Sequence, residues 1–433
     1  MTLYAVLGLA AAGLEAAFVG MLLLGNLKTQ VVEYILLAFG AFLLYLISVY
    51  LATRLPPSRR LLGWIFVAGL AFRATLFPLY PSLSDDLLRY RWEGKAQAAG
   101  INVYRVPPLD PEARAIRDET WPSVNGKTFT SVYGPITELV FRAAWSVARL
   151  APTSAGTVLL MKLPSLLFDL GTATLLVWLL LRLGLPATRV LVYWWSPLAI
   201  VEFAASGHND SIALFFLVAA LLAAEASRIQ FSLTALAASA LSKLFAVFLA
   251  PVLLAREWTR LPSRGLLWPV LLAAVAYFPF RDTNVFSGVA AFSGAWRNND
   301  SLFGVIYWLT GSVSSAFRVY MAVVAGTALY LAARRTPLRR ATYLILGTLL
   351  AFAANCFPWY LTWMLPLLAI ELNPAWLLLT GTSALAYHIL IPYGTLGQWQ
   401  ESGIFRILEY VPFYALLIGR WLGHKRAEMK HAK

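Results

Sequence analysis

The sequence predicts an all-α polytopic membrane protein. Of its 433 residues, 60% are hydrophobic and only 13% are charged, and the mean hydropathy is +0.68. Soluble domains carry about 25% charged residues, so this composition excludes a soluble globular domain as well as a disordered chain. Apolar runs of about 20 residues, the length that crosses a bilayer, recur along the whole chain. The single cysteine, Cys356, excludes an intramolecular disulfide and a cysteine-based metal cluster.

The apolar runs predict the membrane spans in order. The run Leu3–Leu24 is too long for a signal-peptide core and lacks a basic flank, so we expect it to be the first span. The run 230–255 carries Lys243 in its middle and Pro251 near its end, and we expect two short helices that meet at Lys243. The total is about 13–14 spans. They are predicted at 3–24, 31–53, 61–79, 157–181, 188–205, 211–226, 230–242, 243–255, 265–280, 313–333, 341–357, 359–372, 375–393 and 405–423.

Clusters of basic residues predict the orientation. Lys and Arg concentrate in cytoplasmic loops of membrane proteins, and this location accounts for the net charge of +14 without any nucleic-acid partner. Placing every cluster in the cytoplasm gives a consistent path with both termini inside. The clusters are Arg54, Arg59 and Arg60; Arg182 and Arg189; Arg228; Arg256, Arg260 and Arg264; Arg334, Arg335, Arg339 and Arg340; and the tail with Lys425, Arg426, Lys430 and Lys433.

Four polar segments then fall on the outer face. The largest is 80–156, far longer than an ordinary connection of about 4–6 residues. The others are 206–211, a second large loop at 281–312, and 355–360. Within the first loop, Ser84 is the predicted N-cap of a helix at 85–98 that lies along the membrane surface, and a further interfacial helix is expected at 136–149.

Acidic residues in these loops are candidates for catalysis. A carboxylate at Asp85 or Asp86 is placed to take a proton from a sugar or lipid hydroxyl, although capping of the helix explains the same pair. Asp210, in His208-Asn209-Asp210, is either a second site residue or the cap of the next helix. A Mg or Mn site built from Asp210 and the acidic pair is an alternative. One histidine among scattered carboxylates is not a zinc pattern, so we expect no metal and no cofactor.

Cations and aromatic residues complete the candidate site. Lys243 interrupts an apolar stretch at high cost, which predicts a phosphate-binding role, with snorkelling to the interface as the alternative. Arg281 and Arg297 are further phosphate candidates. Weaker candidates are Arg73 and Arg318, with the intramembrane Asp169 and Glu202 as structural partners of such cations. A sugar ring is expected to stack on the aromatic residues beside the polar loops, namely Trp296, Trp359 and Tyr360.

The motifs of the first loop point to a known superfamily. The string from Ser84-Asp85-Asp86 through Trp92-Glu93-Gly94 to Gly100-Ile-Asn102-Val-Tyr104 resembles the first outer loop of bacterial GT-C glycosyltransferases. The resemblance is closest to the branch of polyprenyl-phosphate-sugar-dependent mannosyltransferase-like enzymes, and it spans about residues 60–425. Tyr133-Gly134-Pro135 is similar to the Tyr-Pro-Pro of that branch, with glycine in place of the first proline. Familiar elements of the branch also include Gly207-His208-Asn209-Asp210, Lys243, Trp296-Arg297-Asn298 and Pro358-Trp359-Tyr360.

The resemblance implies one GT-C domain over residues 1–433, with the catalytic base at Asp85 or Asp86. It implies an inverting transfer of a hexose, with mannose favoured, from a polyprenyl-phosphate donor to a lipid or glycan acceptor at the outer face of a bacterial cytoplasmic membrane. The expected substrate contacts are Arg89, Tyr90, Trp92, Glu93, Tyr104, Tyr133, His208, Asn209, Asp210, Trp296, Asn298, Trp359 and Tyr360.

Two alternatives stay open at this stage. One is a pentose or aminosugar transferase of the same fold, and the other is a flippase or transporter of lipid-linked sugars. A transporter is expected to show inverted repeats and ionisable groups near the midplane. The polar clusters of this sequence instead fall at one surface, which favours the enzyme.

Overall fold

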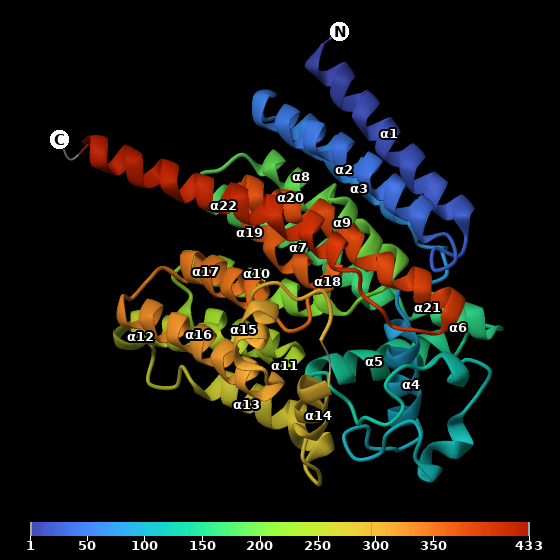
Figure 1. Cartoon of the computed structure of the whole chain (residues 1–433). Coiled ribbons are helices and arrows are strands. Elements are labelled where there is room, and N and C mark those ends of the chain that lie inside the picture. The colour runs from blue at the N-terminus through green and yellow to red at the C-terminus, as the bar shows by residue number, and fades with distance from the viewer. Residues whose placement is uncertain (1, 296, 432–433) are drawn as a thin grey trace.

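The structure, a computed structural model, describes residues 2–295 and 297–431. Within these ranges the regular elements are helices (Figure 1), apart from an isolated parallel β-bridge between Asn298 and Asn355. Five helical stretches there are long and apolar enough to cross a membrane. They are α1 (Leu3–Leu24), α2 (Val31–Arg54), the stretch Ser154–Arg182, α16 (Val313–Ala333) and the stretch Pro374–Leu396. The predicted polytopic helical membrane fold is confirmed.

The remaining helices are shorter, and several apolar ones are built from two or three pieces. The other α-helices are α3 (Arg59–Leu76), α4 (Asp86–Ala98), α5 (Pro135–Ala148), α6 (Ser154–Leu160), α7 (Leu163–Arg182), α8 (Leu191–Trp194), α9 (Pro197–Ile200), α10 (Asp210–Glu225), α11 (Ile229–Ser242), α12 (Ala250–Glu257), α13 (Leu267–Tyr277), α14 (Ser287–Ala295), α15 (Leu302–Thr310), α17 (Leu338–Ala351), α18 (Pro358–Leu361), α19 (Leu365–Ile370), α20 (Pro374–Thr382), α21 (Leu390–Leu396) and α22 (Gly403–His431). The π-helical turn is η4 (Val201–Ala205), and the 3-10 helices are η1 (Pro111–Ile116), η2 (Trp121–Ser123), η3 (Ala187–Val190), η5 (Leu244–Leu249), η6 (Trp258–Arg260), η7 (Phe278–Phe280), η8 (Thr362–Met364) and η9 (Ser383–Ile389).

The break at Lys243 lies where the sequence predicts it. α11 ends at Ser242, Lys243 is extended with φ −152° and ψ 127°, and η5 and α12 then continue the chain. By contrast, the predicted single span 188–205 is divided into η3, α8, α9 and η4. Pro197 explains the division, because a proline lacks the backbone N–H of a helix interior and disfavours helical backbone at the preceding residue.

Basic loops gather at one end of the bundle. The Arg256 guanidinium donates a 2.8 Å hydrogen bond to the carbonyl oxygen of Arg335. Arg182 donates to the carbonyl oxygen of Glu225, whose carboxylate lies 3.7 Å from Arg339. The turn between α1 and α2 lies instead beside the 80–156 segment. Several of the loops that the sequence assigns to the cytoplasm, those at Arg182, Arg256 and 334–340, therefore lie at one end of the bundle.

The 80–156 segment folds around α4, a helix that the sequence predicts. Leu87–Gly94 are all buried, so α4 is a central element of this segment. A Cβ at Gly94 would lie 2.4 Å from the carbonyl oxygen of Phe141, so glycine permits the close contact between α4 and α5. The helix begins at Asp86 with Asp85 at its N-cap, one residue later than predicted. Ser84 Oγ still accepts a 3.2 Å hydrogen bond from the Asp86 N–H.

A buried ion pair joins α3 to α7. The Arg73 Nε lies 2.5 Å from Asp169 Oδ2, and the Tyr193 hydroxyl donates a 2.6 Å hydrogen bond to the other oxygen of Asp169. Both charged side chains are almost fully buried. The structural role expected of Asp169 is therefore confirmed, and Arg73 is its partner.

Candidate functional site

Asp86 stands at the first turn of α4. The Asn125 amide donates a 2.6 Å hydrogen bond to Asp86 Oδ1, and 24% of the Asp86 side chain is exposed. Burial raises the pKa of Asp86 to about 6, although the bond from Asn125 and the charge of Lys243 act in the opposite direction. A carboxylate with a pKa near 6 is largely ionised at neutral pH and is still basic enough to accept a proton.

Asp85 occupies different surroundings. Its carboxylate lies 3.4 Å from the Lys28 ammonium, which belongs to the turn between α1 and α2. Adjacent helical residues point about 100° apart, which is why the two carboxylates meet different partners. Asp85 thus links two segments, whereas Asp86 faces the polar groups described next.

Lys243 is paired with Asp210. The ammonium lies 2.5 Å from Asp210 Oδ1, and the Trp363 indole donates a 2.6 Å hydrogen bond to the same oxygen. Asp210 is fully buried, whereas 23% of the Lys243 side chain is exposed, and the ammonium lies 4.9 Å from the centre of the Tyr360 ring. Tyr360 adjoins Trp359, which stacks on His208 beside Asp86, so printed contacts link the pair to Asp86, and both charges of the pair act on the pKa of Asp86.

Helix α5 holds the chain at the Lys243 break. The Thr137 hydroxyl donates a 3.0 Å hydrogen bond to the carbonyl oxygen of Ser242. A Cβ at Gly134 would lie only 2.0 Å from the carbonyl oxygen of Leu241. This contact excludes a side chain at position 134, which explains the glycine in Tyr133-Gly134-Pro135.

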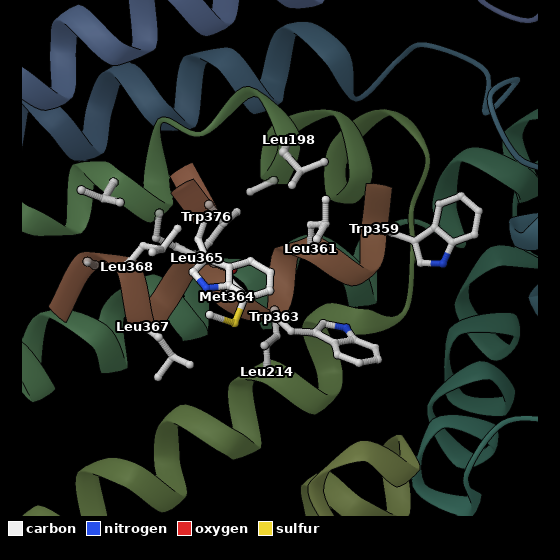
Figure 2. Close-up of a cluster of buried hydrophobic side chains, with 14 of the residues drawn as sticks. Leu198, Leu214, Trp359, Leu361, Trp363, Met364, Leu365, Leu367, Leu368 and Trp376 are labelled. Carbon is white, nitrogen blue, oxygen red and sulfur yellow. The ribbon is translucent and has the colours of Figure 1, made fainter. Parts of the chain in front are cut away.

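His208 lies between Asp86 and a second buried carboxylate. Its Nδ1 is 3.8 Å from Asp86 Oδ2, and its Nε2 is 3.5 Å from Glu202 Oε2. The imidazole stacks on Trp359, with ring centres 4.1 Å apart. Figure 2 shows Trp359 and Trp363 on the α18–η8 segment, with Trp363 beside Met364 and Leu214 and the Trp359 ring pointing away from the cluster of buried side chains.

Several predicted substrate contacts have partners inside the 80–156 segment. Arg89 forms an ion pair with Glu93 at 2.8 Å and donates to the carbonyl oxygens of Gly126 and Phe129. The other buried members of this group are Tyr90, which stacks on Phe141; Trp92, which lies 5.3 Å beneath the Arg89 guanidinium; and Tyr104, whose hydroxyl donates to the carbonyl oxygen of Tyr133. These contacts stabilise the segment that carries Asp86.

The predicted phosphate ligands Arg281 and Arg297 are each paired with a neighbouring aspartate. The Arg281 side chain is 61% exposed and 3.9 Å from Asp282, while Arg297 pairs with Asp300 at 2.6 Å. No described contact joins either arginine to Asp86 or Lys243, and their phosphate-binding role stays a prediction.

The remaining predictions are placed as follows. The Asn298 side chain accepts a 3.2 Å hydrogen bond from Trp399 beside the β-bridge. Asn209 is buried at the N-cap of α10 but makes no side-chain capping bond. Trp296 lies outside the described residues.

Four site residues are not found by the sequence reasoning, or are assigned another role by it. Asn125 donates a hydrogen bond to Asp86 and Trp363 donates one to Asp210, yet neither donor belongs to a recognisable motif. Lys28 is an isolated cation in a short turn. Glu202, expected to pair with a cation, instead accepts a 2.8 Å hydrogen bond from Tyr387 and faces His208.

A metal ion in this site would have to be held by its carboxylates. Among the described residues, no three His, Cys, Asp or Glu side chains are arranged to hold one. The Asp210 carboxylate already meets the ammonium of Lys243. Mg²⁺ commonly takes only one or two carboxylates together with water and substrate phosphates, so the expected absence of a metal stays a prediction that chelation tests.

Comparison with known proteins identifies one family. The family model described as "Alpha-(1->6)-mannopyranosyltransferase, N-terminal domain" matches residues 2–259. The match runs from α1 through α12 and includes Asp86, His208, Asp210 and Lys243. No curated protein matches the chain.

Proposed function

We propose, from the premise that the chain belongs to the alpha-(1->6)-mannopyranosyltransferase family, that this membrane mannosyltransferase transfers mannose from a polyprenyl-phosphate donor. The acceptor is a glycan or lipid with a free mannose hydroxyl, and the reaction takes place at the outer face of the membrane. The lipid donor suits the site because its phosphate lies at the interface while its chain stays in the bilayer.

The observation that carries this proposal is that Asp86 and Lys243 lie in one polar cluster, close enough for the Lys243 charge to lower the pKa of Asp86. In an inverting transfer, a base takes the proton of the acceptor hydroxyl. The hydroxyl oxygen bonds to the anomeric carbon, and the bond from that carbon to the phosphate oxygen breaks on the opposite face. Such a reaction requires one anion that accepts a proton and one cation that stabilises the leaving phosphate. Asp86 and Lys243 supply this combination.

Asp86 is the better candidate for the base. Its raised pKa and its place beside the Lys243–Asp210 pair support this role. Asp85 is engaged by Lys28 instead. A single displacement that inverts the anomeric centre gives an α-linked product from a β-linked donor, which accords with the linkage in the family's description.

Lys243 is the proposed ligand of the leaving phosphate. An ammonium has three donors, and Asp210 takes one of them in the described contacts, so the exposed face of Lys243 can meet a phosphate oxygen. Asp210 and Trp363 hold the cation in place before the substrate arrives. We propose that the sugar ring packs on the aromatic side chains that adjoin this pair, Tyr360 and Trp359.

The direct test is transfer from a panel of radiolabelled polyprenyl-phosphate sugars by the purified protein in nanodiscs. We expect transfer of mannose, with α-(1→6) linkage, and little transfer of pentose or aminosugar. Preferential transfer from a pentose donor would reassign the substrate. Transfer from a nucleotide sugar alone would overturn the proposal that the donor is a polyprenyl-phosphate lipid. A separate experiment, in which labelled donor is supplied only inside sealed vesicles, tests on which face of the membrane the reaction takes place.

A further inference from the structure

We infer that His208 and Glu202 are positioning residues that fix the carboxylate of Asp86 through a line of three side chains. The inference rests on the proposed role of Asp86 as the base. It concerns how the site is organised and not which substrate it takes.

The geometry places the imidazole between two carboxylates. His208 Nδ1 is 3.8 Å from Asp86 Oδ2, and His208 Nε2 is 3.5 Å from Glu202 Oε2. Both ring nitrogens and Glu202 Oε2 are buried without a hydrogen-bond partner. Buried polar atoms of this kind are costly unless they acquire partners, and each of these atoms faces its natural partner across a short gap.

The protein fixes the imidazole from several sides. The backbone N–H of His208 donates a 2.9 Å hydrogen bond to the carbonyl oxygen of Glu202, and the Ser165 hydroxyl donates a 2.8 Å bond to the carbonyl oxygen of His208. Trp359 covers one face of the ring. Gly207 has φ +74°, a backbone conformation that other residues rarely adopt, and this turn directs His208 back toward Glu202.

Glu202 is fixed in turn by Tyr387, whose hydroxyl donates a 2.8 Å hydrogen bond to Oε1. Glu202 lies in the π-helical turn η4, and such turns recur at functional sites. No described cation pairs with this buried carboxyl group. A neutral, protonated Glu202 is therefore the form that its surroundings favour.

The number of protons available then determines which group donates and which accepts along Glu202, His208 and Asp86. A neutral imidazole has one donor and one acceptor. A protonated Glu202 donates to Nε2, which places the ring proton on Nδ1, where it points at Asp86 Oδ2. The gap of 3.8 Å closes when substrate compresses the site, as catalytic hydrogen bonds commonly do. The bond orients Asp86 and stabilises its charged form, while a free lone pair on the carboxylate accepts the acceptor's proton.

Two pairs of variants test the inference. His208→Leu removes the donor to Asp86, whereas His208→Asn keeps an amide N–H near the position of Nδ1. Glu202→Leu removes the donor to Nε2, whereas Glu202→Gln keeps one. Partners that orient a reactive group typically contribute about 10–100-fold. We expect kcat to fall by about 10–100-fold in both leucine variants, with the KM for the donor nearly unchanged. We expect His208→Asn and Glu202→Gln to keep most of the parental kcat.

The pH dependence of kcat in these variants distinguishes a positioning role of His208 and Glu202 from a role in packing alone. Loss of the donor raises the pKa of Asp86, so the acid limb of kcat moves to higher pH in both leucine variants. The titratable and charged groups near His208 and Asp86 include Asp85, Glu202, Asp210, Tyr387, Tyr360, Lys243 and Lys162, whose stem lies beside Gly207; each variant changes only the residue that is replaced.

His388→Leu is the matched control. His388 is also a buried imidazole, stacked on Phe405, but it bonds only to backbone groups, and we expect its loss to leave the acid limb in place. If His208→Leu keeps the parental kcat and pH profile, and Asp86→Asn is inactive, the inference about His208 and Glu202 is overturned and the proposed function is not. If His208→Leu does not fold, the two Glu202 variants provide the test. An equal loss of kcat in Glu202→Gln and Glu202→Leu contradicts the inference that Glu202 donates a hydrogen bond to His208. An active Asp86→Asn instead overturns the proposed function.

Discussion

Lys243 and Asp210 form an ion pair at 2.5 Å in which the carboxylate is buried and the ammonium is partly exposed. This asymmetry explains why a cation interrupts an apolar stretch of the chain. The buried partner fixes Lys243, and the exposed face remains open to an anion. A snorkelling lysine, in contrast, would extend to bulk water and would have no buried acidic partner.

Replacement of Lys243 tests its proposed contact with the leaving phosphate. Lys243→Met removes the cation, and we expect turnover to fall by about 10²–10³-fold with weaker donor binding, because a preorganised charge at the leaving group is lost. Lys243→Arg keeps the charge and retains part of the function. Donor affinity and turnover are measured together in nanodiscs. If Lys243→Met equals the parent in both, the phosphate site lies elsewhere.

The hydrogen bond from Asn125 to Asp86 predicts a pH effect. The bond stabilises the ionised carboxylate and so lowers its pKa against the effect of burial. Asn125→Leu therefore raises the pKa above about 6. Since the reaction needs the deprotonated base, the rate rises with pH through this pKa, and the acid limb of kcat moves upward in the variant. If the acid limb of kcat stays in place in Asn125→Leu, the hydrogen bond from Asn125 does not act on the group that serves as the base.

The buried pair of Arg73 and Asp169 predicts a large effect on stability. Asp169→Ala leaves the arginine charged and buried without its partner, which costs about 3–5 kcal/mol. We expect a clear fall in the thermal unfolding midpoint in detergent. The double variant Arg73→Met with Asp169→Leu is the control, because it removes both charges and regains part of the loss. Equal midpoints for parent and Asp169→Ala contradict the structural role.

Chelation tests the absence of a catalytic metal. In the proposed mechanism, Lys243 supplies the positive charge that a divalent ion would otherwise place at the phosphate, and Asp210 is paired with Lys243. We therefore expect mannosyl transfer to keep its rate in excess EDTA. Loss of activity in the chelator, restored by Mg or Mn, would make Asp210 a metal ligand and change the account of the leaving group.

The sequence predicts the elements of the fold well because their signals are local. Apolar length identifies α1 and α2, and a single charge at Lys243 identifies the break after α11. The motif around Asp85 and Asp86 locates α4. The interrupted span at 188–205 is missed because a continuous apolar run hides the effect of Pro197.

The partners within the site are harder to predict because they depend on tertiary contacts. Asn125 meets Asp86 from 39 positions away, across an irregular part of the 80–156 segment. Trp363 is one of sixteen tryptophans in the chain, and interfacial belts account for tryptophans in general. Glu202 is noticed as an intramembrane acid, but only the turn at Gly207 reveals that a histidine faces it.

The most direct test of the central claim compares Asp86→Asn with Asp85→Asn in mannosyl transfer from polyprenyl-phosphate mannose. Asparagine keeps the size of the side chain but cannot accept the proton, so Asp86→Asn is expected to lower turnover by about 10²–10⁴-fold while the protein stays folded and binds donor. Asp85→Asn, which loses only its contact with Lys28, is expected to retain substantial activity. Near-parental turnover in Asp86→Asn would contradict the account.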